Sequence, residues 1–187
     1  MMKKELELAL NELLSKRVLI YPTDTIWGLG CDATAQDAVE KIYAIKRRSE
    51  SKSLIILVDG MDMLKNYVST VPNEIEKFLK TAIKPTTVIY HHPVGLAPNV
   101  VASDDTVGIR IVQSDFCKNL IREFGKPIVS TSANFSGAPS PSSFDEIDPL
   151  LLKQADYVVN LPAAETKNTA SQIIKVNDLG EIEFLRK

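Results

Sequence analysis

Hydroxyl side chains, one carboxylate and two glycines follow a short apolar run near the N-terminus. The stretch YPTDTIWGLGCDA covers residues 21–33 and places Thr23, Asp24 and Thr25 directly after a proline. In an open α/β sheet, ligands bind beyond the ends of strands, where loops gather backbone and hydroxyl groups. Two interpretations stay open: part of a binding site, or a proline-led turn in which the glycines only let the chain bend.

Four cations lie close together further along the chain. Lys46, Arg47, Arg48 and Lys52 fall at the end of an expected helix and in the loop that follows it. Cations at a helix C-terminus complement the helix dipole, so a solvated basic helix end is one explanation. A clamp for polyphosphate is the other, because arginine binds phosphate through two parallel hydrogen bonds and lysine supplies a point charge.

A serine-rich segment, STSANFSGAPSPSS, covers residues 130–143 directly after a short apolar run. Hydroxyls and a side-chain amide at such a position can line phosphate oxygens or complete the coordination of a hard cation such as Mg²⁺. The segment is not a P-loop, because the pattern G-x-x-x-x-G-K-[ST] is absent. A flexible serine-rich loop is the alternative interpretation.

Composition limits the class of protein. The 187 residues are 44% hydrophobic and 25% charged with a formal net charge of −2, which predicts one globular domain over residues 1–187. That net charge gives no global case for nucleic-acid binding. Cys31 and Cys117 lie far apart and the two histidines are adjacent, so neither a disulfide nor a metal site is indicated. No apolar run approaches the roughly 20 residues that span a membrane, and a cytoplasmic protein is expected.

Helical and strand patterns alternate along the chain and must position these segments. Apolar spacing predicts helices over 3–16, after a Thr34–Asp37 capping box, from Pro72, and between Ser114 and Gly125. Short apolar or alternating runs predict strands over 17–22, 53–58, 86–90, 107–112, 127–131, 157–160, 171–176 and 181–186. This interleaving predicts one α/β domain with a mixed sheet.

Taken in order, the motifs YPTDTIWGLGCDA, KRR, TVGIR, STSANFSGAPSPS and FLR are similar to those of the YrdC family. Each motif alone is weak, whereas the ordered series covers nearly the whole chain. The resemblance implies a YrdC/RibB-like twisted mixed sheet flanked by helices, with a concave basic face. It also implies synthesis of threonylcarbamoyl-AMP from L-threonine, bicarbonate and ATP, with release of pyrophosphate, for modification of adenosine 37 in tRNA.

The resemblance also implies roles for individual residues. The K-x-R and S-x-N motifs assign catalysis to Lys46, Arg48, Ser132 and Asn134. The threonine-binding residues it implies are Thr25, Arg110 and Ser130. The ATP-binding residues it implies are Arg48, Lys52, Thr106, Ser132, Ser140 and Arg186. Mg²⁺ is expected to bind through the triphosphate rather than through protein ligands, and Asp24 to orient the pocket or attract the ammonium group.

Departures from the family pattern keep other functions open. Ser49 replaces a proline, Leu57 stands where some members have histidine, and Gln172 replaces a threonine. The last two keep open an adenylating enzyme with a different acceptor amine. A second alternative is a noncatalytic RNA- or ribosome-binding protein of the same fold, although such a protein would need no hydroxyl and amide set. tRNA is expected to be reached directly or through a threonylcarbamoyl-transferase complex, without a membrane.

Overall fold

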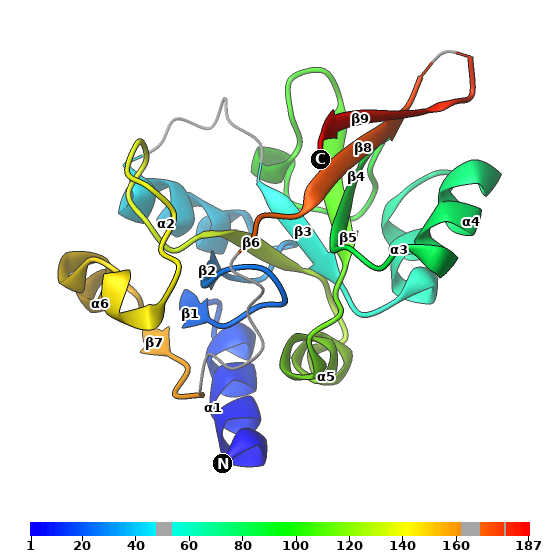
Figure 1. Cartoon of the computed structure of the whole chain (residues 1–187). Coiled ribbons are helices and arrows are strands. Elements are labelled where there is room, and N and C mark those ends of the chain that lie inside the picture. Colours follow the sequence, from blue (N-terminus) through cyan, green and yellow to red (C-terminus); the bar gives the residue numbers. More distant parts are fainter. Residues whose placement is uncertain (48–53, 162–168, 178) are drawn as a thin grey trace.

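The computed structural model describes residues 1–47, 54–161, 169–177 and 179–187 (Figure 1). The helices are α1 (Met2–Leu14), α2 (Gln36–Lys46), α3 (Met61–Tyr67), α4 (Asn73–Thr81), α5 (Asp115–Phe124) and α6 (Pro149–Gln154), with short 3-10 helices at Pro98–Val100 and Phe144–Glu146. The strands are β1 (Leu19–Tyr21), β2 (Gly28–Gly30), β3 (Ile55–Val58), β4 (Thr86–His91), β5 (Thr106–Ile111), β6 (Ile128–Ser132), β7 (Tyr157–Val158), β8 (Gln172–Val176) and β9 (Ile182–Arg186). No helix in these ranges is long and apolar enough to cross a membrane.

The described strands form one mixed sheet in the order β7-β1-β2-β6-β3-β5-β4-β8-β9. Three neighbouring pairs are parallel: β7 with β1, β3 with β5, and β4 with β8. The other neighbouring pairs are antiparallel. The predicted mixed α/β fold is therefore confirmed.

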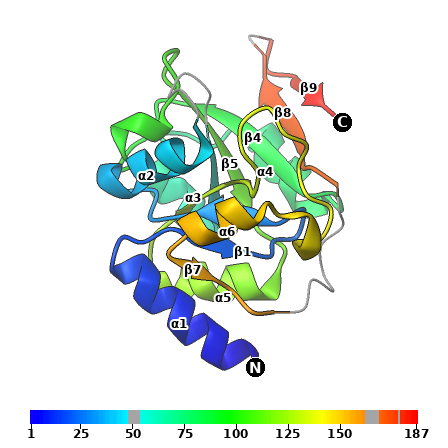
Figure 2. The ribbon, with the colours of Figure 1, turned by 90° about the vertical axis from the view of Figure 1, so that its left-hand side faces the viewer.

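Helices cover the two faces of the sheet unequally. Apolar side chains of α2, α3, α4 and α6 pack on one face in a single large core cluster. On the other face, α1 and α5 form a smaller cluster with one end of the sheet and lie beneath it in Figure 1. Figure 2 shows these two helices side by side below β1 and β7. The rest of that face carries no helix among the described residues.

Local sequence explains the ends of α5. Ser114 accepts a hydrogen bond at its hydroxyl from the backbone N–H of Cys117, as an N-cap does, and Gly125 ends the helix in the left-handed conformation. Both features were predicted. The predicted capping box at Thr34 and Asp37 is wrong, because Ala35 is the N-cap and the Thr34 hydroxyl donates to Asp32 instead.

One strand and two α-helices were not predicted, β2, α3 and α6, nor were the two short 3-10 helices. Strand β2 has the sequence GLG, which lacks the β-branched side chains that mark a strand. Its glycine at position 30 is required by close packing, because a Cβ there would lie 2.1 Å from the carbonyl oxygen of Val129. Tertiary packing rather than local preference therefore makes β2 a strand.

Candidate active site

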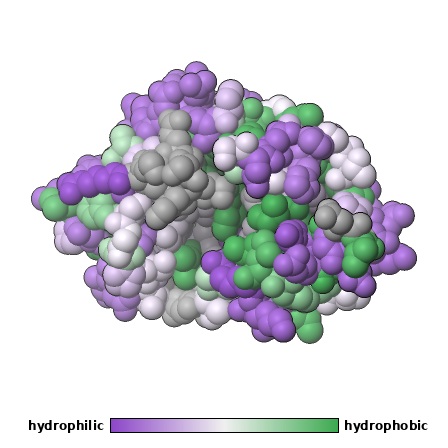
Figure 3. Space-filling view, turned by 90° about the horizontal axis from the view of Figure 1, so that it is seen from above, coloured by the Kyte–Doolittle hydropathy of each residue, from purple (hydrophilic) through white to green (hydrophobic). Residues whose placement is uncertain are grey.

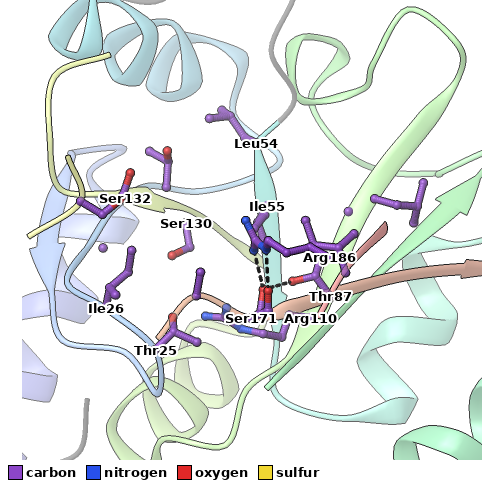
Figure 4. Close-up of a pocket in the computed structure, with 17 residues that line it drawn as sticks. Thr25, Ile26, Leu54, Ile55, Thr87, Arg110, Ser130, Ser132, Ser171 and Arg186 are labelled. Carbon is purple, nitrogen blue, oxygen red and sulfur yellow. Dashed lines mark hydrogen bonds between the residues drawn. The ribbon is translucent and has the colours of Figure 1, made fainter. Parts of the chain in front are cut away.

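A cavity of about 300 Å³ opens on the part of the sheet that α1 and α5 leave uncovered (Figure 4). It is lined by Thr25, Ile26, Gly28, Leu54, Ile55, Thr87, Ile89, Gly108, Arg110, Ser130, Thr131, Ser132, Ser140, Ala170, Ser171, Ile173 and Arg186. These described lining residues include two guanidinium groups and many hydroxyls but no carboxylate. The cavity is therefore suited to an anionic ligand.

Strand register explains the floor of the cavity, because residues paired across strands share one face. One row across β6, β3, β5 and β4 contains Ser130, Ile55, Gly108 and Ile89. The next row, continued into β8, contains Ile128, Leu57, Arg110, Thr87 and Ile173. Leu57 and Ile128 are buried in the cluster under α1 and α5. Arg110 is thus the first residue of that row to reach the cavity.

The threonine-rich turn after β1 presents a hydroxyl to the cavity. The Thr23 hydroxyl donates to the carbonyl oxygen of Ile26 at 2.7 Å and accepts from the backbone N–H of Thr25 at 3.0 Å. The two threonine hydroxyls lie 2.9 Å apart. Because Thr23 has already donated its hydrogen, the Thr25 hydroxyl must be the donor of that contact. Its lone pairs are left as acceptors for a ligand.

Arg110 forms a buried ion pair with Asp24 at one end of the cavity. The Arg110 Nη2 atom lies 3.4 Å from Asp24 Oδ1, and the two side chains are 4% and 5% exposed. The second oxygen, Asp24 Oδ2, and Arg110 Nε have no hydrogen-bond partner among the described residues. Arg110 lines the cavity whereas Asp24 is not among the described lining residues. The pair therefore offers the cavity a guanidinium whose charge is partly balanced by a buried carboxylate.

Arg186 approaches the cavity from the last strand, and Figure 4 shows it beside Ser171. Its Nε donates to the carbonyl oxygen of Ser171 at 2.9 Å and its Nη2 to the Ser171 hydroxyl at 3.4 Å. That hydroxyl also bonds to the hydroxyl of Thr87 at 2.8 Å. Burial and the nearby charge of Arg110 lower the pKa of Arg186. No carboxylate in the described chain pairs with Arg186, so an anion placed between the two arginines would relieve their repulsion.

Lys46 ties the end of α2 to the segment after β6. Its Nζ donates to the carbonyl oxygens of Ser132 and Asn134, at 2.6 and 2.8 Å, and to Asn134 Oδ1 at 3.1 Å. The Ser132 hydroxyl donates to the same Oδ1, and Asn134 Nδ2 donates to the carbonyl oxygen of Ala138. The lysine is only 2% exposed. The K-x-R lysine and the S-x-N motif are thus in direct contact, and only Ser132 among these residues lines the cavity.

The remaining predicted site residues fall in three groups. Ser130 and Ser140 line the cavity with Thr25 and the two arginines. Thr106 is buried at the start of β5, where its hydroxyl donates to Asp104 at 2.7 Å, and it is not among the described lining residues. The other residues, Arg48, Ser49 and Lys52, lie outside the described residues.

Two departures from the family pattern do not line the cavity. Leu57 is fully buried beside Arg110 in the apolar cluster under α5. Gln172 donates from Nε2 to the hydroxyl of Thr86 at 2.7 Å, one residue away from the cavity-facing position of β8. Neither replacement therefore alters the cavity lining directly.

Sequence reasoning assigned no role to Thr87 or Ser171 in holding Arg186. Thr87 carries one signal, since it alternates with apolar Val88 in β4 and is fully buried. A polar side chain at an inward strand position needs a partner, which Ser171 supplies. Cys31 is fully buried, and burial raises the pKa of its thiol.

The mixed sheet and its arginine-lined cavity define an α/β domain suited to anionic ligands. The chain belongs to the Sua5/YciO/YrdC family, whose model carries the description "Telomere recombination" and matches residues 11–187. A putative threonylcarbamoyl-AMP synthase of Methanocaldococcus jannaschii is 37% identical over 94% of this chain and 82% of its own length. A threonylcarbamoyl-AMP synthase of Pseudoalteromonas translucida is 34% identical over 89% of this chain and 90% of its own.

Solved structures share the fold. Sua5 of P. abyssi, crystallised in complex with L-threonine, matches all of this chain with a TM-score of 0.89 and 25% identity. The chain spans about half of that Sua5 chain, 54% of its length. E. coli YciO matches the whole chain and 90% of its own length with a TM-score of 0.81 and 21% identity, a likeness of fold alone.

Proposed function

We propose that the chain makes L-threonylcarbamoyl-AMP from L-threonine, bicarbonate and ATP and releases pyrophosphate. The observation that carries the proposal is the cavity itself, which places two differently paired arginines among hydroxyl groups. An enzyme that joins an amino acid to a nucleotide needs one site for a carboxylate and one for phosphates. The relatives named threonylcarbamoyl-AMP synthase favour this enzyme over a noncatalytic RNA- or ribosome-binding protein.

Threonine is assigned to the Arg110 end of the cavity. The guanidinium of Arg110 would bind the carboxylate, because arginine matches carboxylate geometry with two parallel hydrogen bonds. The Thr25 hydroxyl has acceptor lone pairs for the amino group or the side-chain hydroxyl. Ser130 lines the same cavity and is proposed to add a third polar contact.

ATP is assigned to the part of the cavity lined by Arg186, Ser132 and Ser140. Arg186 has no carboxylate partner among the described residues and can therefore give its charge to a phosphate. Arg48 and Lys52 are proposed to add positive charge to the triphosphate, and Thr106 is proposed to face the nucleotide. Mg²⁺ enters with ATP as part of that substrate and neutralises phosphate charge.

The reaction needs positioning and charge neutralisation rather than a covalent enzyme intermediate. The ammonium group of bound threonine first gives up a proton to solvent, and the free amine then attacks the carbon of bicarbonate and forms a carbamate with loss of water. A carbamate oxygen then bonds to the α-phosphorus of ATP while the bond to the departing pyrophosphate breaks. Lys46 contributes by holding Ser132 and Asn134 in one fixed arrangement, because preorganised donors stabilise developing charge without reorganising.

We further propose that a single domain over residues 1–187 performs this reaction in the cytoplasm. The threonylcarbamoyl group of the product would pass to tRNA directly or through a transferase complex. An adenylating enzyme with a different acceptor amine is the competing hypothesis. Leu57 and Gln172, the residues that suggested it, do not line the cavity.

Labelled bicarbonate tests the proposal and identifies the acceptor together. The purified chain is incubated with ATP, Mg²⁺, ¹⁴C-bicarbonate and one amino acid at a time, and labelled adenylates are separated by chromatography. We expect label in an adenylate only with L-threonine, and none with the Arg110→Met variant. A labelled adenylate with another amine but not with threonine would show that threonine is not the acceptor. The absence of a labelled adenylate with every amine would contradict the proposed enzyme activity.

A further inference from the structure

We propose that Asp24 makes the Arg110 end of the cavity selective for a zwitterion over a bare anion. This inference deepens the proposed function and rests on it, because it concerns how the amino-acid substrate is chosen. Asp24 is not a lining residue and its Oδ2 atom is sealed from solvent. It therefore does not touch the ligand and acts through its charge, as a specificity-determining residue behind Arg110.

The pairing of Asp24 with Arg110 is poorly suited to stabilising the fold. A buried ion pair offsets the loss of hydration only when its geometry is good and further hydrogen bonds satisfy its remaining atoms. Here one contact of 3.4 Å joins the two groups, and Asp24 Oδ2 and Arg110 Nε have no partner in the described chain. A feature that adds little to folding, yet retains a buried charge beside a cavity, points to a role toward the ligand.

The two arginines of the cavity differ in net charge. Arg110 has an aspartate behind it, so this end of the cavity is close to neutral overall. Arg186 bonds only to an uncharged residue, Ser171, among the described contacts, and keeps its full positive charge. Phosphate groups should therefore prefer the Arg186 end. A phosphate at the Arg110 end would face the negative charge of Asp24.

A zwitterion escapes this penalty. When its carboxylate binds Arg110, its ammonium group lies in the same end of the cavity and is attracted by Asp24. Arg110 and Asp24 are 4% and 5% exposed, and charges at such a buried pair interact more strongly than charges in water. The same carboxylate without an ammonium group is only repelled by Asp24. We expect the aspartate to change the preference between the two ligands by about tenfold.

The experiment compares two ligands that place the same carboxylate on Arg110. L-Threonine and its deaminated analogue, 3-hydroxybutyrate, are titrated calorimetrically into the unmodified chain and into Asp24→Asn. Any loss of Arg110 positioning weakens both ligands and cancels in the ratio of their dissociation constants. We expect the preference for threonine to fall about tenfold in Asp24→Asn and inorganic phosphate to bind more tightly. Parallel changes that leave the ratio intact would overturn the proposal.

Asp32→Asn is the matched control, because Asp32 is also a buried aspartate paired with a cation, but it does not line or adjoin the cavity residues. Its ratio should equal that of the unmodified chain. Asp24→Glu keeps the charge and should keep the preference within about twofold. If Asp24→Asn does not fold, the unmodified chain still tests the proposal. Equal affinity of the unmodified chain for L-threonine and 3-hydroxybutyrate would contradict it. A preserved threonine preference without adenylate formation would refute the proposed function and leave this inference standing.

Discussion

Two buried aspartates of this chain pair with cations and differ in how completely their oxygens are used. Asp32 accepts at Oδ1 from the backbone N–H and the hydroxyl of Thr34, at 2.8 and 2.7 Å, and at Oδ2 from Lys126 at 3.1 Å. Asp24 accepts one contact of 3.4 Å from Arg110, and its second oxygen has no partner among the described residues. The first carboxylate is satisfied by the fold and the second is not.

This difference separates a structural aspartate from one that serves a site. Asp32 anchors the segment between β2 and α2, and its cation is half exposed, so water also helps to solvate the pair. Arg110 is 4% exposed and reaches the cavity. A buried polar group without partners is costly to the fold, so it persists where a ligand makes use of it. Incomplete pairing is thus the feature on which the proposal of an amino-acid site at the Arg110 end rests.

Removing each cation in turn should produce the largest contrast. Arg110→Met leaves Asp24 buried without a counter-charge and should lower the free energy of unfolding by roughly 3–5 kcal/mol. It should also reduce threonine-dependent pyrophosphate release by about 100-fold. Lys126→Met should cost about 1 kcal/mol or less, because Asp32 keeps both Thr34 donors. Urea unfolding measures the free energy of unfolding of both variants. Equal decreases in the two variants would contradict the distinction between Asp24 and Asp32.

A methyl group at Gly28 tests whether the Arg110 end is shaped for a small amino acid. A Cβ there would lie 3.0 Å from the Ser130 hydroxyl and 3.2 Å from Thr23 Cγ2. Gly28→Ala should therefore raise the KM for threonine about tenfold and leave the KM for ATP nearly unchanged. Gly60→Ala is the control, because its Cβ would meet no atom within 4 Å. A rise in the KM for ATP alone would show that ATP, and not threonine, binds beside Gly28.

Ser171→Ala sharpens the comparison at the other arginine. The change removes the hydroxyl that accepts from Arg186 and bonds to Thr87. Because the backbone contact of Arg186 remains, we expect the KM for ATP to rise about 3- to 10-fold, as for the loss of one hydrogen bond. The KM for threonine should change less than about twofold. Ser69→Ala, which removes a hydroxyl bonded to His92 at the surface, is the control.

Thr34→Val should give the smallest effect. It deletes one donor to Asp32 and retains the backbone N–H and the Lys126 contact. The free energy of unfolding should fall by about 1 kcal/mol, as for one hydrogen bond. Neither KM should change, since Thr34 does not line the cavity. A changed KM for threonine in Thr34→Val would show that Asp32 also contributes to threonine binding.

Much of the fold was predictable because apolar spacing was regular. The helix from Ser114 to Gly125 carries both end signals, and the apolar runs at β3 and β4 are unambiguous. Strand β2 was missed because Gly30 is needed for the close approach of Val129. This is a tertiary contact that local sequence does not encode. The capping box at Thr34 failed for a local reason instead, since Asp32, two residues earlier, accepts the hydrogen bond of the same hydroxyl.

The site was predictable as a set of residues and not as a set of contacts. Motif order pointed to Thr25, Arg110, Ser130, Ser132, Ser140 and Arg186, all of which line the cavity. Which arginine is balanced by a carboxylate depends on strand register and on the turn after β1, and spacing in the sequence does not give this. Thr87 was missed because its partner, Ser171, lies 84 residues away.

Seen from above, hydrophilic and hydrophobic side chains are interspersed over the surface of the molecule (Figure 3). The most direct test of the proposed function is pyrophosphate release by the unmodified chain with ATP and Mg²⁺, omitting threonine and bicarbonate in turn. We expect release only when both are present, whereas release from ATP alone, or none under any condition, would contradict the proposed enzyme.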